Sequence, residues 1–217
     1  MAAHLPDPRP SLERRERADA ARNRRRVLAA AEELFAARGA RDVTMEDIAR
    51  AAGVGKGTLY RRFPDRSSIA VALLDEHERA LQERLLRGPP PLGPGAPPAE
   101  RLAAFYAAMV ELLERHLPLA LGAETGPRRF ATGAYGFWHA HVRALVVEAV
   151  GDQAGDQDRL DALVDVLLAP LAPDLYQHQR DRGRSAADVT AALTHLARAT
   201  LGRPDGDRPG LRSPRAG

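Results

Sequence analysis

Apolar side chains recur at intervals of three and four residues along most of this chain, the spacing that gathers them on one face of an α-helix. Residues 21–38 illustrate the pattern, because Val27, Leu28, Ala31 and Leu34 fall on a single stripe. No segment has the alternation of apolar and polar residues expected of a half-buried β-strand. The pattern therefore predicts an all-α protein.

The same periodicity, interrupted by glycine and proline, predicts where the other helices begin and end. Residues 88–98 consist mostly of proline and glycine and are expected to form a loop, since proline has no amide donor. Pro170 and Pro173 are expected to kink or break a long helical pattern. The expected helices after the first span residues 44–52, 56–63, 66–87, 99–117, 137–150, 158–182 and 185–201.

Two of these helices begin with a pair of residues whose spacing predicts the geometry of the first turn. Thr44 stands three residues before Asp47, and Ser185 stands three residues before Asp188. This spacing lets each hydroxyl accept from the backbone N–H while the carboxylate accepts from the backbone of the capping residue. Both helices are therefore expected to begin with a capping box.

Residues 44–63, TMEDIARAAGVGKGTLYRRF, predict a helix, a sharp turn at Gly53 and a second, shorter helix. Such a unit can place its second helix in the major groove of DNA. Lys56, the only lysine of the chain, stands at the start of that helix. Leu59 and Phe63 lie on the opposite side of the same helix and are expected in the core. The segment favours a helix-turn-helix.

The charge of the chain is unevenly distributed. The net charge is +3, but residues 1–66 carry +5 and residues 67–217 carry −2. A phosphate-binding segment attached to a near-neutral body would produce this distribution. The arginines of the N-terminal segment are expected either to reach phosphates or the minor groove, or to form an ordinary solvated surface.

Composition excludes several classes of site. Cysteine is absent, which removes disulfides and thiolate ligands. No stretch has the length of apolar residues that a membrane span needs, and no signal-peptide pattern is evident, so the cytoplasm is the expected location. His139 and His141 are two residues apart and cannot ligate one metal from an intact helix. No catalytic motif is apparent, so we expect no metal, no cofactor and no enzyme activity.

The second half of the chain concentrates the aromatic and soft side chains. Two interpretations are open: the core of a helix bundle, or an apolar pocket for a small-molecule effector. Trp138 and His141 are three residues apart and share one helix face, which makes them the strongest pocket candidates. The candidate pocket residues are Phe105, Met109, His116, Tyr135, Trp138, His141 and Tyr176.

The last two expected helices carry more apolar and alanine residues than a monomer is expected to cover. Alanine permits close helix approach, so a two-fold four-helix interface would bury this surface in a homodimer. The alternative is burial within one chain. The candidate interface residues are Leu160, Leu163, Val164, Leu167, Val189, Leu193 and Leu196.

From about residue 21 to residue 81 the sequence resembles the TetR family of bacterial transcriptional regulators. The resemblance rests on three ordered pieces, VLAAAEELFAARG, VTMEDIARAAGV and GKGTLYRRFPDR. It implies a DNA-binding domain at 19–66 and an effector-binding and dimerisation domain at 67–201. We expect residues 1–18 to form a disordered basic arm and residues 202–217 a disordered tail.

The resemblance also assigns DNA-contacting positions. It places Thr44 next to a phosphate and Tyr60 against the sugar-phosphate backbone. Family members often have serine where this chain has Gly55, so one side-chain contact is missing here. The expected groove-facing residues are Lys56, Gly57, Thr58 and Arg61, and the expected phosphate-binding residues are Arg62 and Arg66.

The implied function is that of a homodimeric repressor of a partly palindromic DNA operator, released by an effector of unknown identity. Residues 66–87 would link the DNA-binding part to the effector-binding part. Two alternatives remain open. The chain could be a DNA-binding dimer without an effector, or a small all-α enzyme.

Overall fold

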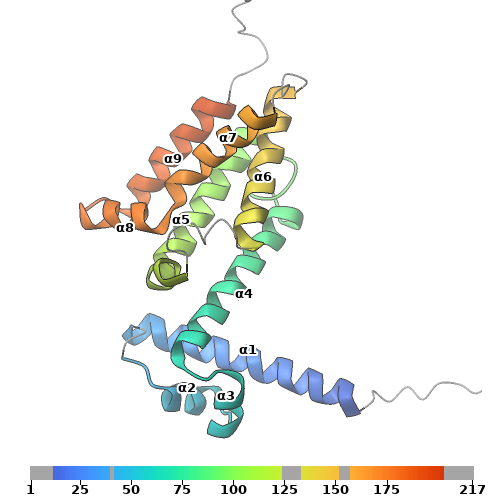
Figure 1. Cartoon of the computed structure of the whole chain (residues 1–217), viewed down its shortest axis with the longest axis vertical. Helices are drawn as coiled ribbons and strands as arrows, with labels where there is room; N and C mark the ends of the chain where they lie inside the picture. The colour runs from blue at the N-terminus through green and yellow to red at the C-terminus, as the bar shows by residue number, and fades with distance from the viewer. Residues whose placement is uncertain (1–11, 40–41, 124–132, 152–156, 203–217) are drawn as a thin grey trace, which may run out of the picture. The chain divides into compact units, whose positions relative to one another are not determined.

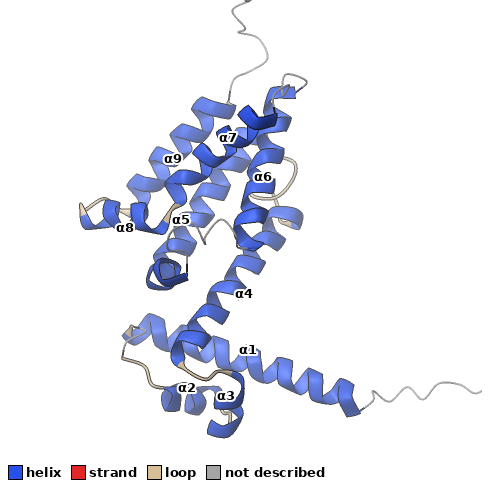
Figure 2. Ribbon diagram, in the orientation of Figure 1, coloured by secondary structure: helices blue, strands red, loops and turns tan. Residues whose placement is uncertain are grey.

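The computed structural model describes residues 12–39, 42–123, 133–151 and 157–202. Within these ranges the chain is helical and contains no strand (Figures 1 and 2). It divides into two compact units, Met1–Asp75 and Glu76–Gly217, here called the head and the body. The expected all-α class is confirmed.

The head is built from three helices and the start of a fourth. Its core is formed where these helices meet, and Ile48, Leu59 and Ile69 are each at most 1% exposed. Val27, Leu28 and Ala31 of the first apolar stripe are buried with them. The helices are α1 (Leu12–Arg38), α2 (Met45–Ala52), α3 (Lys56–Arg62) and α4 (Arg66–Arg87).

Helix α1 begins earlier than the sequence predicted. Residues 12–18, expected in a disordered arm, form its first turns. Arginine, glutamate and alanine are good helix formers, and Arg22 forms an ion pair with Asp19 three residues before it. The expected arm at 1–18 is corrected to this extent, while residues 1–11 lie outside the described part.

The body is a bundle in which α5 packs against α9, α6 and α8, and α6 packs against α7 (Figure 1). Its core contains Leu102, Val142, Leu145 and Val164, none of which is exposed. The elements are α5 (Pro98–Ala123), α6 (Gly133–Val150), α7 (Gln157–Leu168), η3 (Ala169–Leu171), α8 (Pro173–Asp181) and α9 (Ala186–Leu201).

The two prolines break the long helical pattern as expected. Pro170 lies in the short 3-10 segment η3, and Pro173 is the first residue of α8, where its missing amide costs no helix bond. Ser185 caps α9 by accepting from the amide of Asp188 at 3.1 Å, and the reciprocal bond is also present. The expected tail beyond Gly202 lies outside the described residues.

Helix α4 supplies residues to both cores. Ile69 and Leu73 belong to the core of the head, whereas Leu81 and Leu85 belong to the core of the body. The boundary between the units falls inside this helix, after Asp75. None of the described helices is long and apolar enough to cross a membrane.

Candidate nucleic-acid interface

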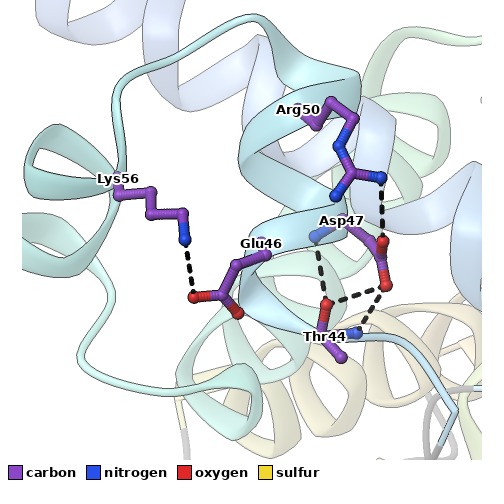
Figure 3. Close-up of polar contacts among 5 residues, drawn as sticks. All are labelled: Thr44, Glu46, Asp47, Arg50 and Lys56. Carbon is purple, nitrogen blue, oxygen red and sulfur yellow. Dashed lines mark hydrogen bonds and ion pairs between the residues drawn. The ribbon is translucent and has the colours of Figure 1, made fainter.

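The first turn of α2 is fixed by the capping box that the sequence predicted. The Thr44 hydroxyl accepts from the amide of Asp47 at 3.1 Å, and the Asp47 carboxylate accepts from the Thr44 amide at 3.2 Å (Figure 3). Arg50 donates to the same carboxylate at 3.4 Å. The bonds from the Thr44 hydroxyl and amide hold the pKa of Asp47 below its usual value. In this structure the hydroxyl and the amide of Thr44 both take part in the capping box. A phosphate contact at Thr44 would have to form in addition to these bonds.

The turn between α2 and α3 depends on Gly53, whose φ of 59° lies in the left-handed region. Its carbonyl accepts from Arg26 of α1 at 3.0 Å. A Cβ added at Gly53 would come within 2.5 Å of the same guanidinium. The hydrogen bond from Arg26 thus holds the turn between α2 and α3 against helix α1.

Helix α3 buries one side and exposes the other. Leu59 is 1% exposed, and the following Phe63 is 4% exposed. At 3.6 residues per turn, Gly57 and Arg61 lie opposite this buried side. Lys56 and Tyr60 lie on one flank of the exposed face, and Thr58 and Arg62 lie on the other. All six side-chain positions of that face are exposed to solvent.

The two expected glycines of this segment have different surroundings. Gly57 has open space where a side chain would be, so the backbone itself forms part of the exposed face. Gly55 is the capping residue of α3, and no side-chain bond caps the helix there. Glycine has no hydroxyl that could form such a capping bond.

Arg66 has a different environment from the other arginines expected at the interface. Its guanidinium is partly buried and donates to the Val43 carbonyl at 3.1 Å, joining the start of α4 to the segment that precedes α2. Arg62, by contrast, is exposed. The structure thus gives Arg66 an internal partner, which the sequence did not indicate because the two residues are 23 positions apart.

A groove between α1 and α3 adds Asp19, Ala20 and Asn23, which the sequence analysis had not assigned to the interface. Its volume is about 780 Å³. Arg24 also lies over the ring of Phe63, 5.9 Å from its centre. The available signal was the spacing of Asp19, Ala20, Asn23 and Arg24, which puts them on one face of α1. The groove is lined by Asp19, Ala20, Asn23, Arg24, Thr58, Arg61, Arg62 and Phe63.

In the body, three of the seven expected pocket residues form one aromatic cluster. The Phe105 ring lies 5.8 Å from that of Trp138 and 5.4 Å from that of His141, measured between centres. Burial lowers the pKa of His141 to about 4, with a further contribution from Arg101. His141 Nε2 and Arg101 Nε are buried and have no hydrogen-bond partner among the described residues. Such buried polar atoms are uncommon in native structures.

The other four pocket candidates make other contacts. His116 is 6% exposed and pairs with His77 of α4 through ring nitrogens, at a point where α5 departs from helical geometry. Tyr176 is buried and donates to Glu114, and Tyr135 donates to Asp165 at 2.9 Å. Met109 is buried in the body core. Three of the seven residues thus form the ring cluster, and His116, Tyr135 and Tyr176 have polar partners outside it.

The expected dimer residues are mostly internal. Five of the seven are buried in the core of their own chain, and Leu163 and Leu196 pack partly buried against it. These five side chains are covered largely by their own chain, and the expected dimer interface through them stays a prediction. Solvent-exposed Val166 and several alanines occupy the other faces of α7 and α9. The buried five are Leu160, Val164, Leu167, Val189 and Leu193.

No group of three metal-ligating side chains lies together in the ranges that the structure describes. The site is instead a positively charged helix face: Lys56, Arg61 and Arg62 can donate hydrogen bonds, and Gly57 leaves room for close approach. Arginine and lysine donors match guanine O6 and N7 as well as phosphate oxygens. The geometry therefore suits a ligand that carries a row of phosphates and exposes hydrogen-bond acceptors of its bases between them.

Comparisons with known proteins find a family match within the head. The family model described as "Bacterial regulatory proteins, tetR family" matches residues 27–73. A protein of Mycobacterium tuberculosis, named an uncharacterized HTH-type transcriptional regulator, is 28% identical over 149 residues. That match covers 69% of this chain and 63% of the relative, so the chain spans less than two thirds of the relative's length.

Solved structures extend the similarity of fold to the body. A TetR/AcrR-family transcriptional regulator from Thermobifida fusca has a TM-score of 0.61 at 23% identity, covering 80% of this chain and 95% of that one. FadR from Bacillus subtilis, solved in complex with stearoyl-CoA, has a TM-score of 0.56 at 18% identity, covering 80% and 96%. The head of this chain thus matches the tetR family of bacterial regulatory proteins over residues 27–73, and the chain shares its fold with solved TetR-family regulators.

Proposed function

We propose that this protein is a sequence-specific DNA-binding transcriptional repressor that acts as a homodimer on a partly palindromic duplex. A small-molecule effector bound in the body would release it from DNA. The observation that carries the proposal is the exposed face of α3, with Gly57 and Arg61 at its centre.

The dimensions and chemistry of α3 support base reading. The major groove of B-DNA is about 12 Å wide and admits a helix. Open space at Gly57 allows the backbone to approach the base edges, and Arg61 beside it can donate two hydrogen bonds to a guanine. Because Leu59 and Phe63 hold the opposite side in the head core, the face is presented on a rigid support.

Phosphate contacts would come from the two flanks of α3. Arg62 and Arg24 line the groove beside α1, where they can meet one DNA strand. Tyr60 on the other flank is 43% exposed and can pack against sugar and phosphate. Arg66 would contribute by fixing the head rather than by touching DNA, since its guanidinium is held by Val43.

The proposed effector is a small molecule with a substantial apolar part. A structural neighbour, FadR of Bacillus subtilis, was solved with stearoyl-CoA. In this chain the cluster of Phe105, Trp138 and His141 offers apolar contact. The buried Arg101 Nε and His141 Nε2 offer polar atoms whose hydrogen-bonding capacity is otherwise unused in the described region.

Effector binding can act on DNA only by favouring one state of the protein over another. Helix α4 is the proposed coupling element, because the same helix contributes Leu73 to the head core and Leu81 to the body core. A ligand with equal affinity for the DNA-bound and DNA-free states would change nothing.

The alternative that remains is a DNA-binding dimer without an effector. The direct packing of Phe105 against Trp138 and His141 favours it, since these rings already contact one another. Fluorescence of Trp138, the only tryptophan, distinguishes the two, because a ligand entering this cluster would change its emission. The enzyme alternative has no such support, since the relatives and neighbours reported above carry the names of regulators.

The test is selection of duplexes from a random-sequence pool, followed by affinity measurements on the enriched sequence. We expect a two-fold symmetric motif, and we expect Tyr60→Ala to weaken binding to it while helicity stays unchanged. Recovery of unrelated sequences that bind only at low salt would contradict the proposal, because phosphate contacts alone produce that behaviour.

A further inference from the structure

The first turn of α3 contributes no buried side chain to the head core. Leu59 is the buried residue of this helix, and residues 55–58 before it are all exposed. Gly55 caps the helix without a side-chain bond. In the turn that leads into α3, Val54 stands between two glycines, which allow the backbone more freedom than other residues do. The position of the first turn of α3 therefore depends on what holds the segment in front of it.

Polar contacts with α2 and α1 hold the beginning of α3. Lys56 Nζ, on the first residue of α3, lies 3.2 Å from Oε1 of Glu46 on α2 (Figure 3). Arg26 Nη2, on α1, donates to the carbonyl of Gly53 at 3.0 Å. The contact with Glu46 uses the ammonium group that would also donate to a base, whereas the contact with Gly53 uses no group of α3. The bond from Arg26 can therefore persist unchanged while Lys56 binds DNA.

Arg26 can hold the turn because its own helix is fixed by the head core. The next residue, Val27, is 3% exposed, and Ala30 and Ala31 are buried in the same core. Gly53 is the C-terminal capping residue of α2, a place where an arginine side chain can bond the last carbonyls of a helix. The positive charge of the guanidinium strengthens such a bond. The bond thus joins the start of the turn to a helix that the core keeps in place.

We propose that Arg26 is a positioning residue for sequence recognition, because its bond to the Gly53 carbonyl sets where the first turn of α3, which carries Lys56, meets the base edges of DNA. The proposal rests on the DNA-binding function proposed above. Hydrogen bonds to bases need a close match in distance and angle, whereas attraction to phosphates is mainly electrostatic and depends less on geometry. Loss of the Arg26 bond should therefore weaken binding to a matching sequence more than binding to an unrelated one.

The test compares the wild type with Arg26→Met, which removes the donors and the charge but keeps a long side chain. Each protein is measured on the enriched duplex and on a duplex of shuffled sequence, at one salt concentration near physiological ionic strength and then over a series of salt concentrations. The matched control is Arg25→Met, which removes the same charge from the neighbouring exposed position of α1. Circular dichroism verifies that each variant is folded.

Arg26→Met is expected to bind the enriched duplex about fivefold more weakly than Arg25→Met for each bound head, the low end of the cost of one mismatched base pair. On the shuffled duplex the two variants should have the same affinity and the same salt dependence. Selection from a random-sequence pool should show that Arg26→Met relaxes the preference at the base pair that Lys56→Gln also relaxes. In the Lys56→Gln background, Arg26→Met should therefore cost no more than Arg25→Met does.

Equal losses on both duplexes, with a salt dependence lower than that of the control by about one counterion, would overturn the proposal and make Arg26 a phosphate contact. Affinities equal to those of Arg25→Met on both duplexes would also overturn it, since the bond to Gly53 would then serve the fold alone. A cost of Arg26→Met that is the same with and without Lys56 would do so as well. Failure of the underlying function has a separate signature, because the wild-type protein would then enrich no duplex.

Discussion

Acidification should destabilise the body because two of its histidines are held neutral. Burial lowers the pKa of His116 from 6.5 to about 4, with smaller electrostatic contributions from His77 and Arg115. Burial and Arg101 have the same effect on His141. The unfolded chain takes up these protons as the pH falls through 6.5, whereas the folded chain does so only near 4. The stability contributed by the neutral histidines is therefore complete above pH 6.5 and lost progressively below it.

The size of the effect follows from the two shifts. One pKa unit corresponds to about 1.4 kcal/mol, so at about pH 5 each histidine should have lost roughly 2 kcal/mol of stabilisation. Together the two would reduce the free energy of unfolding by roughly 4 kcal/mol, a large part of the 5–15 kcal/mol typical of a folded domain. Such a change is well above the error of a denaturation experiment.

Urea unfolding at about pH 7 and about pH 5, followed by Trp138 fluorescence, measures this difference. Trp138 is the only tryptophan and is 5% exposed in the body core, so its emission reports unfolding of that unit. His116→Gln should remove about half of the difference in the free energy of unfolding between the two pH values, whatever its effect on stability at neutral pH. His195→Gln is the control, because His195 is exposed on α9. Equal stability of the wild type at both pH values, or an unchanged dependence in His116→Gln, would refute the reasoning. Protein concentration must be held constant, since a dimer would unfold with a concentration-dependent midpoint.

Four further substitutions should separate the roles assigned to individual residues. Thr44→Ala should lower the stability of the head by about 1 kcal/mol through loss of the cap, measured by thermal unfolding, and a value near zero would contradict the assigned capping role. Arg62→Ala should reduce the salt dependence of DNA binding by about one counterion without loss of head stability. Arg66→Ala should instead lower the stability of the head. The opposite result for the two variants would contradict the roles assigned to these arginines. Val166→Glu, at a site that is 64% exposed, should yield monomers in sedimentation without unfolding the protein, and a persisting dimer would place the interface elsewhere.

Much of the head could be read from the sequence because its determinants are local. The capping box of Thr44 and Asp47 joins residues three apart, and the turn at Gly53 needs only the backbone freedom of glycine. The burial of Leu59 and Phe63 follows from helical spacing. These features depend on neighbours in the chain, which periodicity and capping rules describe.

The sequence was less informative where a side chain meets a distant partner. Arg66 donates to the carbonyl of Val43, a bond that was not expected because no local pattern joins the two residues. His116 pairs with His77, 39 residues before it, which the sequence likewise did not indicate. Such pairs are set by how the helices pack, which the order of residues along one helix does not reveal.

The same limit applies to the residues expected at a dimer interface. Apolar spacing on α7 and α9 shows which positions avoid water but not whether the covering surface is the same chain or another. Leu193 is 6% exposed because α9 packs on α5, so a charged residue there would disrupt the protomer itself. The exposed position of Val166 is the better probe of association.

The measurement that tests the central claim most directly compares the DNA motifs selected by the wild type and by Arg61→Ala. Both proteins would be offered the same random-sequence pool at the same salt concentration. If α3 reads base edges, the variant should lose its guanine preference at one position in each half-site, symmetrically, while the remaining positions are retained. Recovery of the same motif by both proteins would contradict the account, because the residue at the centre of the exposed α3 face would then contribute nothing to sequence recognition.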